Sequence, residues 1–458
     1  MNRRPWLLIF WGVLLGGFAG LAKADQVSFF QEVAPIFRKH CNGCHHPGKK
    51  KGGVDLTSVD AILKGGRDGD IVLKGNPAES LLWDVIAGDE PSMPEDGEPL
   101  SDADLAIIAA WIDQGVIDDS PASTQVAFSD ENPPVYANAP VLSSVAISLD
   151  GETVAVSGYH EILVYDLEKW TLVDRLIGSS PRITSMVFSQ DGETLVAAGG
   201  SPAFFGDVQV WDLKESRMKH VHRLSTDSLF GISVSPDHSR LAVGGADKKT
   251  RIVDLVSGDV EVEFENHSDW VLHTCFSGDG TKLVSGSRDK AMKLIDASNG
   301  QFIDDINQLF EEVLSLAKHP NDDIVAYGGD LGGVRTYRIS DNQLRGGGNT
   351  KRDANILRSY ERMEGAVFAV AFNHDGSLLA AGGVGSSVAV FKVDDGKRIA
   401  DLTGHDGAVF TLGFVGDSNR ILVGGYDGLL REYRADDGSL LRSLEVIPNA
   451  AATSTAGL

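Results

Sequence analysis

Two cysteines and a histidine near the N-terminus have the spacing of a haem attachment site. Residues 40–45 read His-Cys-Asn-Gly-Cys-His. In a Cys-x-x-Cys-His pattern both thiols can form thioether bonds to the vinyl groups of one porphyrin, and the histidine that follows can bind the iron. The pattern therefore predicts one covalent haem c, attached through Cys41 and Cys44, with His45 as the proximal iron ligand.

Two other kinds of site share the Cys-x-x-Cys part of this pattern. A zinc ribbon needs further ligands, and the remaining cysteine, Cys275, is far along the chain in a different predicted domain. A thioredoxin-like dithiol would belong to a βαβ unit, which the sequence around the motif does not indicate. We therefore favour haem attachment over zinc binding and over dithiol chemistry.

The second axial ligand of the iron should come from the chain that follows the motif. Met93, within Pro-Ser-Met-Pro, is the only methionine between residues 25 and 138, and no histidine occurs between His46 and His160. A methionine sulfur stabilises ferrous iron and raises the potential relative to bis-histidine ligation. Met93 is thus the predicted distal ligand, and the weaker candidates are Lys49, Lys50, Lys51, Lys64 and Lys74.

Two amphipathic helices should position these residues. Residues 28–39 have apolar side chains at helical spacing and lead directly into Cys41. Residues 101–104, Ser-Asp-Ala-Asp, resemble a capping box, and apolar residues follow at helical spacing as far as Gly115. Two helices that bracket a haem motif are the layout of a small all-α cytochrome c domain, which we place at residues 25–118.

Residues 30–116 resemble the planctomycete-type cytochrome c domain. The matching segments are His-Cys-Asn-Gly-Cys-His at 40–45, Lys-Lys-Lys-Gly-Gly-Val at 49–54, Leu-Lys-Gly-Gly at 63–66, Gly-Asn-Pro-Ala-Glu-Ser-Leu-Leu at 75–82, Met-Pro at 93–94 and Trp-Ile-Asp-Gln-Gly at 111–115. The family often has Met-Pro-Pro, whereas this chain has Met-Pro-Glu, ending at Glu95. The resemblance implies one covalent haem on Cys41 and Cys44, with His45 and Met93 as axial ligands.

Residues 1–24 have the pattern of an export signal. Two arginines precede an apolar stretch at residues 6–21, and Ala-Lys-Ala at 22–24 suits cleavage. An uncleaved membrane anchor is the alternative, but the apolar stretch is short for a span. We expect cleavage before Asp25, no stable membrane span afterwards, and a periplasmic or otherwise exported location, where haem c is attached.

The rest of the chain is repetitive. Residues 119–138 are acidic and rich in proline, which indicates a semi-stiff linker. From residue 139 to 447 a unit of apolar strands and polar turns recurs, and its first strand ends at positions 41 to 46 residues apart, with one 55-residue interval: Ile147, Phe188, Val234, Phe276, Ala317, Phe372 and Phe414. A period of about 40–45 residues with a Gly-Gly or Ser-Gly second strand is typical of WD40 propellers. We predict an all-β seven-bladed WD40-like propeller, then a tail at 448–458.

The resemblance to WD40 propellers is strong in its period and weak in its motifs. Trp211 begins the only literal Trp-Asp pair of the repeats. His267 and His405 open repeats, and Asp289 and Asp427 occupy turns. WD40 families use such residues in a structural hydrogen-bond network, so we interpret these four residues as architecture rather than chemistry.

The net negative charge of the chain limits the kinds of partner that it can bind. The formal net charge is −24, and a surface of that sign repels nucleic acid, so we expect no nucleic-acid partner. The 55-residue interval indicates an insertion at about residues 340–362 with a net basic composition. This insertion could dock an anionic partner, although we favour a solvated long hairpin.

Three functions are compatible with these features. We favour an exported electron carrier in which one haem serves redox protein partners and the propeller is a protein-binding scaffold. The second is an oxidoreductase whose propeller holds a second cofactor or a substrate, as in nitrite reductases and quinoprotein dehydrogenases of similar layout, with His160, His220, His222 and His273 available as ligands. The third is a haem-based sensor in which Met93 leaves the iron. The sequence indicates no catalytic residues and favours electron transfer over catalysis.

Overall fold

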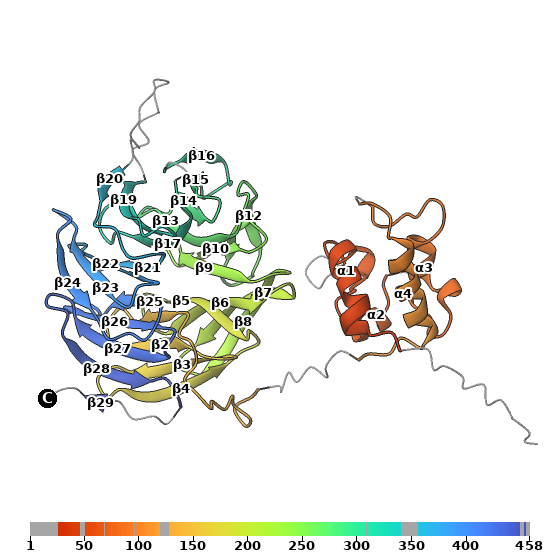
Figure 1. The fold of residues 1–458 in the computed structure, drawn as a ribbon, viewed down its shortest axis with the longest axis horizontal. Helices are drawn as coiled ribbons and strands as arrows, with labels where there is room; N and C mark the ends of the chain where they lie inside the picture. Colours follow the sequence, from red (N-terminus) through yellow and green to blue (C-terminus); the bar gives the residue numbers. More distant parts are fainter. Residues whose placement is uncertain are drawn as a thin grey trace, which may run out of the picture. The chain divides into compact units, whose positions relative to one another are not determined.

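Helices occupy the first part of the chain and strands the rest, in two separate units whose main division falls between residues 122 and 123 (Figure 1). The computed structural model describes residues 26–45, 51–67, 69–95, 97–119, 128–307, 310–339, 356–448 and 453–454. The predicted export signal and most of the predicted insertion lie outside these described residues. The predicted fold class, a small helical domain followed by a seven-bladed propeller, is confirmed.

The helical unit begins with the predicted N-terminal helix. This helix consists of two consecutive segments, η1 (Phe29–Val33) and α1 (Ala34–His40). The second segment, α1, ends at His40, directly before Cys41. Ser28 caps the first segment, because its Oγ accepts a hydrogen bond from the amide of Gln31 at 2.9 Å. The other helical segments of the unit are η2 (Lys51–Gly53), α2 (Val59–Leu63), η3 (Pro77–Glu79), α3 (Leu81–Ile86) and α4 (Asp102–Asp113).

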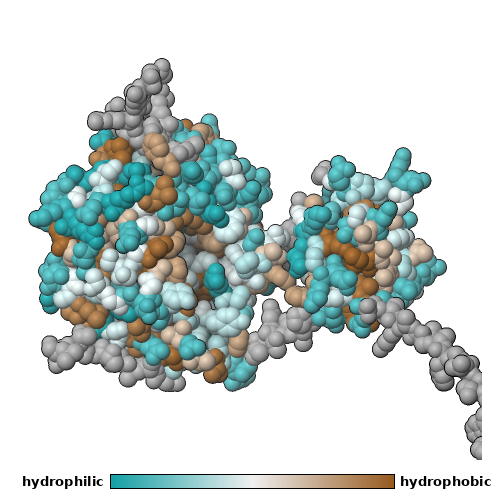
Figure 2. All heavy atoms as spheres, in the orientation of Figure 1, coloured by the Kyte–Doolittle hydropathy of each residue, from teal (hydrophilic) through white to brown (hydrophobic). Residues whose placement is uncertain are grey.

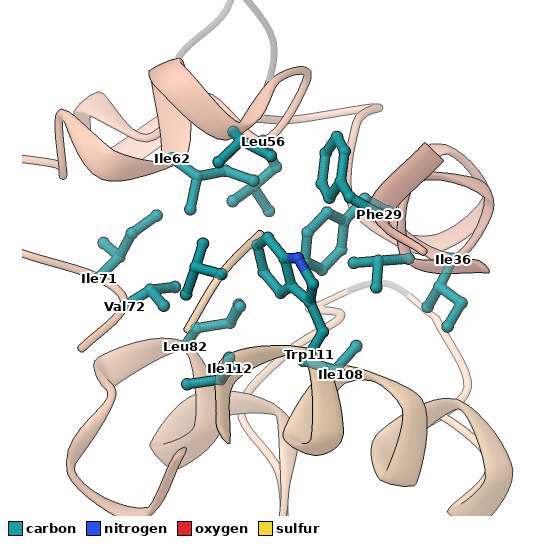
Figure 3. Close-up of a cluster of buried hydrophobic side chains, with 14 of the residues drawn as sticks. Phe29, Ile36, Leu56, Ile62, Ile71, Val72, Leu82, Ile108, Trp111 and Ile112 are labelled. Carbon is teal, nitrogen blue, oxygen red and sulfur yellow. The ribbon is translucent and has the colours of Figure 1, made fainter. Parts of the chain in front are cut away.

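Trp111 of α4 lies at the centre of the core of this unit (Figure 3). Its ring centroid lies 5.2 Å from that of Phe29 and 6.3 Å from that of Phe37, and its Nε1 donates to the carbonyl of Ile117 at 3.0 Å. These contacts hold α4 against η1 and α1. The core therefore fixes the helix that leads into Cys41.

The propeller consists of seven antiparallel sheets, each made of consecutive strands. The first strand of each sheet contacts the first strands of the neighbouring sheets, so these strands surround the axis. In blade order the strands are β1 (Val145–Ile147), β2 (Thr153–Ser157), β3 (Glu161–Asp166), β4 (Thr171–Ile177); β5 (Arg182–Phe188), β6 (Thr194–Ser201), β7 (Phe205–Asp212), β8 (Arg217–Ser225); β9 (Leu229–Val234), β10 (Arg240–Gly245), β11 (Thr250–Asp254), β12 (Val260–Phe264); β13 (Val271–Phe276), β14 (Lys282–Ser287), β15 (Met292–Asp296), β16 (Phe302–Asp305); β17 (Val313–Lys318), β18 (Ile324–Gly329), β19 (Val334–Arg338), β20 (Ile356–Ser359); β21 (Val367–Phe372), β22 (Leu378–Gly383), β23 (Val388–Lys392), β24 (Arg398–Leu402); and β25 (Val409–Phe414), β26 (Arg420–Gly425), β27 (Leu429–Arg434), β28 (Leu440–Glu445), β29 (Thr453–Ser454).

The ring closes where the first blade meets the last. The amide of Leu142 donates to the carbonyl of Gly425 at 2.9 Å, and the amide of Val145 donates to Oγ1 of Thr411 at 2.9 Å. The fourth strand of the last blade is β28, and β29 pairs with its outer edge. Closure therefore needs no strand from the N-terminal part of the chain.

Part of the segment predicted as a linker is bound to the first blade. The hydroxyl of Tyr136 donates to Oε1 of Glu161 at 2.7 Å. Arg175 pairs with the same carboxylate at 2.7 Å and donates through Nη2 to the carbonyl of Pro134 at 2.7 Å. Pro134 and Tyr136 are therefore held to the propeller by hydrogen bonds to the Arg175–Glu161 ion pair, whereas residues 120–127 lie outside the described part of the chain.

The surfaces of both units are largely hydrophilic, and a group of hydrophobic residues is visible on one face of the helical unit (Figure 2). In the part of the chain that the structure describes, no helix has the length and apolar character that a membrane crossing requires.

Candidate cofactor site

The haem motif lies at the C-terminal end of α1 and continues it as a tight turn. The amide of Cys41 donates to the carbonyl of Phe37 at 2.8 Å, which extends the helical pattern to the first cysteine. The amides of Cys44 and His45 then both donate to the carbonyl of Cys41, each at 3.1 Å. This turn gathers the two thiols and the imidazole within one short segment, as the Cys-x-x-Cys-His spacing predicts.

A cavity of about 710 Å³ lies against this turn. Its lining includes Cys41, Cys44 and His45, and it also includes Met93 from the loop after α3. Cofactor pockets have volumes of about 300–1,000 Å³, so the cavity can hold a group of the size of a porphyrin. The structure thus brings all four predicted site residues to one cavity, and their chemical roles stay predictions.

The lysines considered as weaker ligands are separated by the structure. Lys51 lines the cavity, whereas Lys64 and Lys74 are not among its lining residues. Lys49 and Lys50 lie outside the described residues. Within the described chain, Lys51 is therefore the one lysine of this group that stays a candidate beside Met93.

The loop that carries Met93 is fixed by α3. The amide of Met93 donates to the carbonyl of Val85 at 2.9 Å, and the Met93 side chain packs against the hydrophobic core of the helical unit. Leu82 and Ile86 of α3 are buried and line the same cavity. The helix therefore supplies both an apolar wall and the attachment point of the loop.

Three buried polar atoms in the motif have no hydrogen-bond partner among the described residues. They are Nε2 of His40, Oδ1 of Asn42 and Nδ1 of His45. Buried polar groups almost always find a partner, so these three atoms are available to partners other than the described residues. Two thiols, an imidazole and a thioether are the side chains that hold a c-type haem, and the residues present fit that group.

The surroundings of Cys41 argue against a reactive dithiol. Burial raises the pKa of the Cys41 thiol to about 11, whereas a reactive dithiol needs a lowered thiol pKa. Across the described ranges, no group of three or more His, Cys, Asp or Glu residues is arranged to hold a metal ion. An apolar, neutral thiol suits a thioether bond to a porphyrin.

Glycines allow two loops to pack backbone against backbone at this cavity. The amide of Arg67 donates to the carbonyl of Gly52 at 2.8 Å, and both residues line the cavity. Gly65 has a φ of +76°, and a Cβ atom there would lie 2.5 Å from the carbonyl oxygen of Gly69. The position therefore requires glycine both for its backbone conformation and for space.

We expect Gly65→Ala to destabilise the helical unit by about 2–4 kcal/mol. The left-handed conformation alone costs an alanine roughly 1–2 kcal/mol, and the contact with the Gly69 carbonyl adds to it. Gly75→Ala is a matched control, because Gly75 has a φ of +77° but its nearest atom would be 3.9 Å away. Hydrogen exchange of the α4 amides measures both variants, and equal losses of protection would contradict a role for the Gly69 contact.

The four histidines proposed as ligands for a second cofactor do not form one set. His160 lies in the turn between β2 and β3, His220 and His222 stack on the outer strand β8 with centroids 5.6 Å apart, and His273 lies on the inner strand β13. An outer strand and an inner strand are at opposite edges of a blade. The described residues therefore offer no converging histidines to support the oxidoreductase alternative.

His267 and Asp289, which the sequence analysis assigned to a structural network, form a serine–histidine–aspartate series whose serine, Ser285, the sequence analysis did not identify. Nδ1 of His267 lies 2.9 Å from Asp289, and Nε2 lies 2.7 Å from Oγ of Ser285. Although burial opposes it, hydrogen bonds from His267 and backbone amides lower the pKa of Asp289 to about 2. Ser285 is 0% exposed, so a substrate cannot reach it, and the series is architecture. The Ser-Gly-Ser sequence at 285–287 was the available signal.

Comparison with known proteins gives two family matches. Residues 41–97 match the family described as Planctomycete cytochrome C. Residues 179–457, more than half of the chain, match the β-propeller family described as Nucleolar protein 10-like, N-terminal domain. None of the curated proteins matches the chain. The first match covers the haem motif and Met93, and the second begins just before β5 of the second blade.

Proposed function

Because the chain belongs to the family of Nucleolar protein 10-like, N-terminal domain propellers and carries a Planctomycete cytochrome C domain ahead of the propeller, we propose that it is an exported c-type cytochrome that transfers single electrons. The observation that carries this proposal is the cavity that Cys41, Cys44, His45 and Met93 share.

In this proposal each of the four residues has one task. A haem c supplies reversible one-electron chemistry between ferric and ferrous iron. Cys41 and Cys44 would hold it covalently, and His45 and Met93 would both bind its iron. Because two side chains would then bind the iron, it would have no position open to a substrate, which favours electron transfer over catalysis.

Apolar side chains around the cavity support the same function. Leu56, Ile71, Leu82 and Ile86 are buried and line the cavity, and the half-buried Val54 lines it too. A hydrophobic shell limits solvent access and lowers the local dielectric constant, which tunes the redox potential. These residues would therefore exclude water and disfavour the additional charge of ferric iron.

In this proposal the N-terminal segment determines where the protein is located, and the propeller binds partner proteins. Residues 1–24 direct export, and the haem is attached outside the cytoplasm. The electron donor and acceptor are redox proteins, and the propeller binds protein as a scaffold. Redox encounters have small interfaces and depend on salt, so we expect weak and salt-sensitive association.

A cofactor count on the full chain tests the proposal. We expect one covalent haem per chain and no other chromophore after expression in a host with c-haem maturation, measured by the pyridine haemochrome spectrum and intact mass. Replacing both Cys41 and Cys44 with serine should abolish the covalent haem, whereas Cys275→Ser, at a buried thiol of the propeller, should leave it attached.

Two results would contradict the proposal. A mature chain without covalent haem would refute the assignment of Cys41 and Cys44. A second pigment, or a mass released on denaturation, would place chemistry in the propeller and favour an oxidoreductase.

A further inference from the structure

We propose that the ion pair between Lys51 and Glu95 is a positioning device for Met93, because it ties the loop that carries Met93 to the segment that follows the haem motif. This inference rests on the proposed function, in which Met93 binds the iron. Lys51 and Glu95 are positioning residues here, since neither is proposed to touch the iron.

Lys51 is fixed to the haem motif through its backbone. Its amide donates to the carbonyl of Cys44 at 3.0 Å, and the amide of Leu56 donates to the carbonyl of His45 at 3.0 Å. The segment that begins with η2 is therefore held to the turn that carries the second cysteine and the proximal histidine. The Lys51 side chain extends from this anchored segment, and Lys51 is among the residues that line the cavity.

Glu95 belongs to a loop with few other attachments. The amide of Met93 donates to the carbonyl of Val85, but among the described residues Glu95 makes no backbone hydrogen bond. Its carboxylate pairs with Lys51, and Met93, Pro94 and Glu95 all line the cavity. Beside the hydrogen bond to Val85 and the packing of the Met93 side chain against the core, the ion pair is a third contact that holds the described part of this loop.

The ion pair between Lys51 and Glu95 lies near the surface. The Lys51 and Glu95 side chains are 48% and 56% exposed, so water and salt reach the pair. A pair with this exposure has a modest effect that falls as ionic strength rises.

Binding of imidazole to the ferric protein measures how readily Met93 leaves the iron. Imidazole needs the axial position that Met93 occupies, so its apparent affinity depends on the fraction of molecules in which the loop has opened. We expect Glu95→Gln to bind imidazole about two- to fivefold more tightly than the wild type at low salt. The difference should shrink in 1 M salt, where the Debye length is about 3 Å.

Matched variants separate positioning from a general effect of charge. Glu90→Gln removes the same charge from an exposed residue in the same loop region and should leave imidazole affinity at the wild-type value. Exchanging the charges, Lys51→Glu with Glu95→Lys, should restore affinity towards the wild type, because the pair can form again.

Two outcomes overturn the inference, and they are distinguishable. Binding of a methionine sulfur to ferric haem iron gives a characteristic absorption band. If the wild type shows this band but Glu95→Gln binds imidazole with the same affinity as Glu90→Gln, the ion pair does not position Met93, and the proposed function is unaffected. If the wild-type ferric protein lacks that band, Met93 is not the ligand, and both this inference and that part of the proposed function fail.

Discussion

Replacing Met93 with alanine is expected to leave the haem attached. It should remove the absorption band that arises from the bond between ferric iron and the methionine sulfur, and it should lower the redox potential. The haem should stay because, in the proposed function, Cys41 and Cys44 carry the covalent bonds. The potential falls because a thioether favours ferrous iron, and axial ligands set haem potentials over a range of about 0.8 V. The pyridine haemochrome, the ferric spectrum and a potentiometric titration measure the three effects.

A second methionine provides the control for this substitution. Met363→Ala removes a half-buried thioether from the propeller, where the side chain packs against a hydrophobic cluster of the strands. We expect the ferric spectrum and the potential of this variant to match those of the wild type. An unchanged spectrum in Met93→Ala would contradict the ligand assignment and would turn attention to Lys51, which lines the same cavity.

The part of the site that could be predicted from sequence is the part whose chemistry depends on local spacing. Cys41, Cys44 and His45 lie within one turn, so their relation is set by a few backbone hydrogen bonds. Met93 could be predicted because the chain offers no other methionine nearby. Neither inference required knowledge of the tertiary structure.

The contacts that complete the site join residues far apart in sequence. The pairing of Lys51 with Glu95 spans 44 positions, and composition gives no indication of which acid a given lysine meets. The close approach of Gly65 to Gly69 depends on the path of the backbone. Such contacts follow from packing, which a single sequence does not specify residue by residue.

In the propeller, too, the architecture could be predicted from the sequence but individual side-chain contacts could not. The period of the repeat predicted the blades because each blade needs strands of similar length and a turn at similar places. The hydrogen-bond partners of the two repeat-opening histidines could not be predicted, because they differ: His267 bonds to Asp289 and Ser285, whereas His405 contacts Arg431 and Tyr433. Asp427, the counterpart of Asp289, pairs instead with Arg431 at 2.7 Å.

The surroundings of His405 fix it as a neutral imidazole. The hydroxyl of Tyr433 donates to the carbonyl of Thr403 at 2.7 Å, so its oxygen is free to accept from Nε2 of His405, at 3.3 Å. Nδ1 then accepts from Nη1 of Arg431 at 3.4 Å. A second proton, on Nδ1 of His405, would be repelled by the positive charge of the Arg431 guanidinium. Burial, followed by the charge of Arg431, lowers the pKa of His405 to about 4 against the opposing effect of Asp427.

The propeller is therefore expected to lose stability as the pH falls from 6.5 towards 4. In the unfolded chain His405 takes up a proton near pH 6.5, but in the folded chain it does so only near pH 4, so protons favour the unfolded state across this window. His405 is 9% exposed, and the contribution of this one residue should reach roughly 2 kcal/mol by pH 5. Urea unfolding followed by fluorescence at several pH values measures it.

Glutamine at position 405 separates this effect from general acid destabilisation. In His405→Gln the amide oxygen can accept from Arg431 and the amide nitrogen can donate to Tyr433, but the side chain does not titrate. We expect the loss of unfolding free energy between pH 6.5 and pH 5 to be smaller by about 1.6 kcal/mol in this variant than in the wild type. His374→Gln, at an exposed turn, should keep the wild-type dependence. If both variants follow the wild type, protonation of His405 is not what limits the propeller in acid, and the histidine is accommodated in its charged form.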